Sequence, residues 1–94
     1  MNVPVTLNAN CTASPDPATI GRLNGDVLVF QTSAGRFMVE FANGSPYNQT
    51  KFNVGNGAPG NCGPANATAT GSFKYNVTNL GTGTVNDPTV IIKP

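Results

Sequence analysis

Short segments of β-strand character recur along the whole chain, and this feature restricts the fold more than any other. They lie at residues 3–7, 18–20, 26–32, 36–41, 71–78 and 89–93, with Gly, Pro, Asn or Ser between them. No window combines apolar residues at helical spacing with capping residues. Repeated short strands with turn signals predict an all-β, antiparallel or mixed Greek-key sandwich. The 94 residues suffice for one domain, residues 1–94.

Two neighbouring segments carry the clearest strand patterns. The segment 26–32 is apolar at successive positions, which predicts a strand in the centre of a sheet. The segment 36–41 alternates, so Phe37, Val39 and Phe41 should point inward and Met38 outward. Residues 33–35 are short enough to join the two strands as a hairpin.

The middle of the chain has a weaker pattern. We expect residues 42–70 to be largely irregular, with Tyr47 and Phe52 anchored in the core and a loop at 56–64. Residues 66–70 could form a short polar strand. The residues expected to be buried across the fold are Val27, Val29, Phe37, Val39, Phe41, Phe73, Tyr75 and Val77.

The charge pattern excludes some partners. Five basic and four acidic residues give a net charge of +1, and the basic residues are scattered singly. Because no basic stripe could neutralise several phosphates, nucleic acid is not expected as a partner. No apolar run is long enough to span a bilayer. Low charge with abundant Asn and Thr is typical of exported β-domains, so we expect a periplasmic or extracellular monomer, with Met1 standing in place of a removed signal peptide.

The chain has two cysteines, Cys11 and Cys62. In an exported protein they would form a disulfide, and in a cytosolic one they would be free thiols. A shared metal is the third alternative, although two sulfur atoms without histidine supply too few ligands. An active redox pair is disfavoured, because such thiols usually stand two residues apart at the start of a helix.

Three segments resemble the cupredoxin family. Gly25-Asp26-x-Leu28-x-Phe30 is similar to the Gly-Asp-x-Val-x-Phe/Trp strand of that family, and Gly71-Ser72-Phe73-Lys74-Tyr75 is similar to its Gly-x-Tyr-x-Tyr strand. Residues 36–41 stand where the family has its first copper histidine followed by Val-x-Phe. The closing segment 89–94 agrees with the family's final strand. The resemblance implies a cupredoxin-like (plastocyanin-like) sandwich of the kind found in bacterial exported proteins.

The copper ligands of that family are missing here. A blue-copper site needs two imidazoles and a thiolate, but the chain contains no histidine. Phe37 stands at the position of the first ligand, and Asn76 or Val77 stands at that of the cysteine. The resemblance therefore implies a domain without copper or any other cofactor. It also implies that Cys11 and Cys62 lie at the same end of the sandwich, where a bridge could join them. An immunoglobulin-like sandwich is the alternative fold, weakened by the absence of tryptophan.

No catalytic constellation stands out. The four carboxylates are Asp16, Asp26, Glu40 and Asp87, and a triad is excluded without histidine. We therefore expect a non-catalytic module that is structural or binds a protein or a cell surface. Met38 and Tyr47 are its candidate contact residues. The alternatives are a redox or metal-handling protein that uses Cys11 and Cys62, and a domain of a larger adhesin or enzyme.

Overall fold

The computed structural model describes all 94 residues and contains eleven strands and no helix. The all-β prediction is confirmed. The structure contains no apolar helix of membrane-spanning length. The strands are β1 (Asn2–Leu7), β2 (Ala13–Ser14), β3 (Ala18–Gly21), β4 (Val27–Gln31), β5 (Arg36–Glu40), β6 (Lys51–Gly55), β7 (Gly60–Pro64), β8 (Gly71–Lys74), β9 (Asn76–Asn79), β10 (Val85–Asn86) and β11 (Thr89–Lys93).

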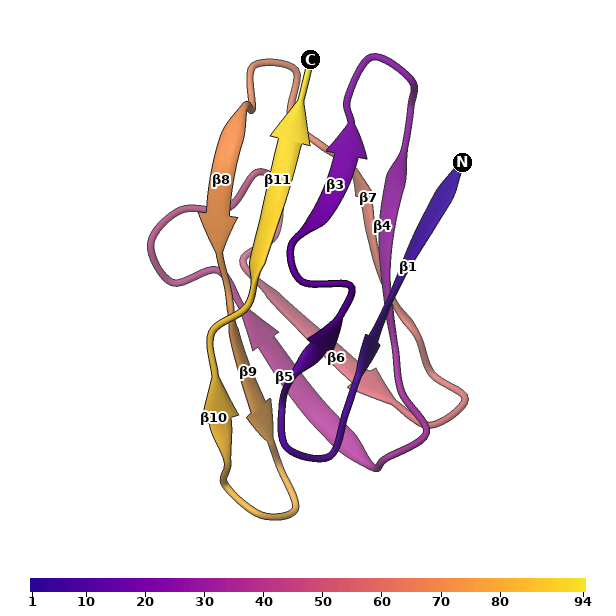
Figure 1. Cartoon of the computed structure of the whole chain (residues 1–94), viewed down its shortest axis with the longest axis vertical. Coiled ribbons are helices and arrows are strands. Elements are labelled where there is room, and N and C mark those ends of the chain that lie inside the picture. Colours follow the sequence, from indigo (N-terminus) through magenta and orange to yellow (C-terminus); the bar gives the residue numbers. More distant parts are fainter.

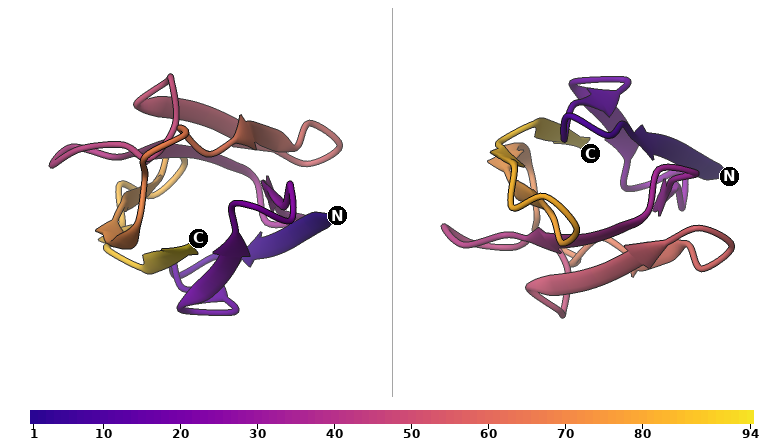
Figure 2. Two further views of the ribbon diagram at one scale, coloured as in Figure 1. Left: turned by 90° about the horizontal axis from the view of Figure 1, so that it is seen from above. Right: turned by 90° about the horizontal axis from the view of Figure 1, so that it is seen from below.

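The strands form three sheets that together enclose one core (Figures 1 and 2). Their orders are β2-β1-β4-β7, β10-β9-β5-β6 and β3-β11-β8. Two pairs are parallel, β1 with β4 and β3 with β11, and the other pairs are antiparallel. Successive strands such as β8 and β9 belong to different sheets, so the chain links the sheets at these points.

Both ends of the sandwich are formed by connections between strands. Four turns meet at one end, which we call the loop end: residues 8–12, 32–35, 56–59 and 80–84 (bottom of Figure 1). The chain termini, the β3–β4 turn and the β7–β8 segment lie at the opposite end.

Strand β4 is central as predicted, lying between β1 and β7. Its inward face was assigned wrongly, however: Leu28 and Phe30 are fully buried, whereas Val27 and Val29 are only half-buried. A strand that is apolar at every position does not reveal from sequence which of its two faces is buried more deeply.

The alternation in β5 predicts its burial correctly. Phe37, Val39 and Phe41 are buried, and Met38 lies half-buried on the outer face beside Asn53 and Thr78. The predicted hairpin between β4 and β5 is wrong, because the two strands belong to different sheets and residues 32–35 cross between them.

The middle of the chain is more regular than predicted. Residues 51–55 and 60–64 form β6 and β7, so the expected loop at 56–64 is shortened to a turn. The predicted strand at 66–70 does not form. Phe52 and Val54 are buried as an alternating pair, and Gly60 and Cys62 alternate in the same way on β7.

Aromatic side chains fill much of the core. The ring of Phe41 lies 5.3 Å from Tyr75 and 5.9 Å from Tyr47, and Phe30 lies 5.1 Å from Tyr75. Tyr75 and Val77 are buried as predicted, but Phe73 is only half-buried, on the edge strand β8 of the sheet β3-β11-β8.

Candidate functional site

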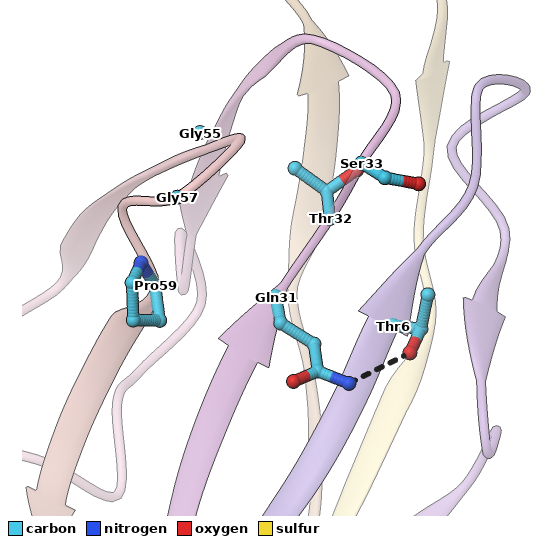
Figure 3. Close-up of a pocket in the computed structure, with 7 residues that line it drawn as sticks. All are labelled: Thr6, Gln31, Thr32, Ser33, Gly55, Gly57 and Pro59. Atoms are coloured by element: carbon cyan, nitrogen blue, oxygen red, sulfur yellow. Dashed lines mark hydrogen bonds between the residues drawn. The ribbon is translucent and has the colours of Figure 1, made fainter.

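Three hollows lie side by side at the loop end. The polar hollow has a volume of about 390 Å³ and is lined by Thr6, Gln31, Thr32, Ser33, Gly55, Gly57 and Pro59 (Figure 3). The small hollow, of about 150 Å³, shares Gly55 with it. The wide hollow, of about 480 Å³, shares Arg36 and Leu80 with the small one. The three hollows therefore adjoin one another, and we treat them as one candidate contact surface.

Arg36 is the only charged residue that lines this surface. It is the first residue of β5 and is exposed. The chain has two ion pairs, Lys74 with Asp87 and the Met1 amino group with Asp26, so no carboxylate neutralises Arg36. A guanidinium carries its charge at all physiological pH values and offers five N–H donors, so this position attracts an anionic group.

Leu80 stands beside Arg36 and contributes apolar surface. Its backbone N–H donates to the carbonyl of Arg36 at 2.9 Å, and 51% of the residue is exposed. An aliphatic residue exposed next to an unpaired charge combines two features of a contact surface. Our sequence analysis missed both residues. The sequence did contain an indication of an exposed apolar residue, because Leu80 is the one large aliphatic residue in the Gly/Thr-rich stretch 79–84.

Asn79 holds the turn that carries Leu80. It is buried, and its Nδ2 donates to the carbonyl of Ala9 at 3.0 Å while its Oδ1 accepts the N–H of Gly81 at 2.9 Å. The first bond joins the β9–β10 turn to the β1–β2 turn. The bond thus holds two of the four turns of the loop end together without a partner, which lowers the ordering entropy that binding would cost.

Cys11 connects the same two turns. Its thiol donates to the carbonyl of Thr84 at 3.1 Å, and the residue is fully buried. Its φ of 67° lies in the left-handed region, which costs a residue with a Cβ about 1–2 kcal/mol. Burial and the bond to Thr84 offset this strain, so Cys11 acts as a structural contact.

The predicted disulfide between Cys11 and Cys62 is wrong: both residues are free, buried thiols. Cys62 lies on β7 opposite the irregular stretch Val27–Val29 of β4, whose Leu28 pairs with Val3 of β1. Leu7, the last residue of β1, is four positions beyond Val3, and Cys11 lies in the turn that follows Leu7. At about 3.3 Å per residue this places the two cysteines about 13 Å apart along the strands, beyond the roughly 7 Å Cα separation that a bridge tolerates.

Cys62 lies instead near two buried tyrosines. The hydroxyls of Tyr47 and Tyr75 have no hydrogen-bonding partner among the protein's atoms. Burial raises the pKa of the Cys62 thiol to about 12. Burial, followed by the charge of Cys62, raises the pKa of Tyr47 well above its ordinary value, and burial does the same for Tyr75. All three groups stay protonated near neutral pH.

Tyr47 cannot serve as the contact residue predicted from the sequence. Only 3% of it is exposed, and its ring packs against Phe41 and Phe52. Met38 lies on the outer face of β5, so its role in contacts stays a prediction. Comparison with protein-family models, curated proteins and solved structures found no match for the chain.

Proposed function

We propose that this chain is a non-catalytic, exported β-sandwich module of the cupredoxin-like type, without copper, that binds a protein or cell-surface partner through its loop end. One observation carries the proposal: of three adjoining hollows, two are lined both by the unpaired charge of Arg36 and by exposed Leu80. Concave surfaces with few, well-placed polar groups are the usual form of binding sites.

The connection of the last strands supports the cupredoxin-like assignment. Residues 71–79 lead through the turn 80–84 into the final strand β11, as the sequence resemblance implies. The immunoglobulin-like sandwich is built from two antiparallel sheets. The parallel pairs β1/β4 and β3/β11 therefore favour the cupredoxin-like alternative. Phe37 and Val77, at positions that the resemblance matches to ligands, are fully buried apolar side chains that pack the core.

The carboxylates support a non-catalytic role because they serve separate local contacts. Asp26 accepts the N–H of Gly21 at 3.0 Å, and Asp16 accepts the N–H of Thr89. Asp87 pairs with Lys74, and Glu40 lies on the outer face of β5. General acid–base catalysis would need two such groups to converge on one substrate.

The thiols give little support to the redox or metal-handling alternative. A pKa of about 12 keeps Cys62 in its protonated form, whereas the thiolate is the nucleophile and the metal ligand. The separation of the two cysteines along the strands prevents them from sharing one metal ion or forming a bridge without a change of fold.

Capture of partners with matched variants tests the proposal. The tagged domain is mixed with the exported proteins of its source, and captured proteins are compared for wild type, Arg36→Gln/Leu80→Ser and Lys51→Gln/Val85→Ser. The control removes one positive charge and one exposed aliphatic side chain outside the hollows. We expect the loop-end variant to lose a protein that the wild type and the control both retain. Equal capture by both variants would contradict the proposal.

Mass spectrometry separates the proposed module from the redox or metal-handling alternative. Two free thiols predict an unchanged mass when reductant is added. A gain of two hydrogens on reduction, or copper or zinc retained after dialysis, would favour the alternative.

A further inference from the structure

We propose that the loop end binds the free carboxyl terminus of an extended protein segment whose last residue is aliphatic. Arg36 binds the terminal carboxylate, and the small hollow takes the last side chain. This inference rests on the proposed binding function and names the class of ligand.

The charge of the site selects the anionic group. Arg36 is exposed, has no acidic partner and is the only charged residue among those that line the three hollows. The planar guanidinium can donate two parallel N–H bonds to one carboxylate, which gives both attraction and a fixed orientation. One positive charge matches one carboxylate, while a stretch of phosphates would need several cations.

The small hollow selects the last side chain. Its volume is about 150 Å³, and its hydrophobic lining consists of exposed Ala58 and Leu80 above the buried core residues Phe37 and Val54. A cavity of about 150 Å³ accepts a molecule as large as benzene, so one Val- or Leu-sized side chain fits. Because Arg36 also lines this hollow, the carboxylate and the side chain of one residue can be held together.

The wide hollow provides a path for the preceding residues. It continues from Arg36 and Leu80 past Gly35 and Gly81, where no side chain covers the backbone. Exposed glycine backbones let another chain approach closely and exchange main-chain hydrogen bonds. A segment lying in the wide hollow would therefore end at Arg36 with its last side chain in the small hollow.

Titration of the ¹⁵N-labelled chain with short peptides tests the inference. The probes are acetyl-Gly-Ser-Thr-Val with a free carboxylate, the same peptide as its amide, and acetyl-Gly-Ser-Thr-Gly with a free carboxylate. The carboxylate form should shift the amide signals of Gly35, Gly55, Leu80 and Gly81 and leave those of Gly21 and Gly71, at the opposite end, unchanged. Amidation and Arg36→Gln should each weaken binding by about tenfold or more, since hydrogen bonds to charged groups are the strong ones.

A matched charge variant serves as the control, and three results would contradict the inference. Lys51→Gln removes the same charge from neighbouring strand β6, outside the hollows, and should leave the affinity unchanged. Replacing the last valine by glycine should weaken binding through loss of the apolar contact. The inference is overturned if acid and amide bind alike, if Arg36→Gln and Lys51→Gln behave alike, or if millimolar peptide shifts no loop-end signal. If the capture experiment still showed a protein that binds the wild type and not the loop-end variant, the proposed function would remain supported in these cases.

Discussion

At the scale of single residues, Asn79 links the core to the candidate site. It is the only buried residue with an amide or charged side chain; its bond to Ala9 joins the turns at residues 8–12 and 80–84, and its bond to Gly81 holds the second of these turns. Buried polar groups with satisfied bonds specify one arrangement of the chain, because every alternative leaves a donor or acceptor without a partner. The position of Leu80 therefore depends on Asn79.

Asn79→Ala should lower the free energy of unfolding by about 1–3 kcal/mol, since it leaves the Ala9 carbonyl and the Gly81 N–H without these partners. In a domain of this size that is a fall of several degrees in Tm. Asn76→Ala is the matched control, because Asn76 lies on the same strand without such bonds and should change Tm little. Thermal unfolding followed by circular dichroism makes the comparison, and equal losses would contradict the role given to Asn79.

The unpartnered tyrosine hydroxyls predict a change of the opposite sign. Tyr75 is buried, and its hydroxyl has no hydrogen-bonding partner among the protein's atoms. Because burying such a group costs about 1–3 kcal/mol, Tyr75→Phe should leave the free energy of unfolding unchanged or raise it. Denaturant unfolding at pH 7 measures the effect. A loss above about 1 kcal/mol, the usual net contribution of a hydrogen bond, would mean that the hydroxyl is bonded after all.

At the scale of strands, β6 and β7 belong to different sheets but approach closely at Gly60. A Cβ placed on Gly60 would lie 2.9 Å from Cγ2 of Val54, and 3.7 Å from Cβ of Phe30. Absence of a side chain at this position therefore permits the contact between the two sheets next to the small hollow.

Gly60→Ala should lower the free energy of unfolding by about 1–3 kcal/mol, the usual cost of overpacking a filled core. Gly55→Ala provides the control, because a Cβ there would lie at ordinary contact distances, 3.8 Å from Cβ of Ala58. Denaturant unfolding of both variants checks the prediction, which fails if Gly60→Ala is as stable as Gly55→Ala.

Strands β1, β4, β5 and β11 could be predicted from the sequence, whereas β6 and β7, in the segment with the weaker pattern, could not. Strands β1 and β5 were predicted because apolar residues recur at every second position of each, and β11 was predicted although Val90, Ile91 and Ile92 form an unbroken apolar run. Strand β7 was missed because its inward residues are Gly60 and Cys62, and glycine at this density is typical of a loop. When the inward-facing residues of a strand are small, their alternation with outward-facing residues barely changes the hydrophobicity along the sequence.

The candidate site depends on contacts that a single sequence does not display. Arg36 and Leu80 are separated by more than forty positions in the chain, and their proximity follows from the bond between the Leu80 N–H and the Arg36 carbonyl. The disulfide was predicted wrongly for the same reason. Without the register of β7 against β4, the sequence did not show how far Cys62 lies from the end of the sandwich that carries Cys11.

At the scale of the whole molecule, buried titratable groups make stability depend on alkaline pH. The pKa of Cys62 rises from an ordinary value of 9.0 to about 12, so the unfolded chain loses this proton at a lower pH than the folded chain. The stabilisation is complete below pH 9 and is lost as the pH rises from 9 towards 12. The raised pKa values of Tyr47 and Tyr75 act in the same direction.

We therefore expect the free energy of unfolding to fall between pH 8 and pH 11, and to fall less steeply in Cys62→Ala. Denaturant unfolding in the presence of reductant, at several pH values, compares the slopes of the two proteins. Parallel slopes would show that the Cys62 thiol does not contribute to the alkaline loss.

The central claim is that partners bind at the loop end of a sandwich whose opposite end stays free. Hydrogen–deuterium exchange of the domain, alone and with a protein captured in a loop-end-dependent way, tests it most directly. The account predicts slower exchange at residues 32–36, 55–59 and 79–84, and unchanged exchange at the β3–β4 turn and at residues 65–70. Protection confined to the opposite end, or to the outer face around Met38, would contradict it.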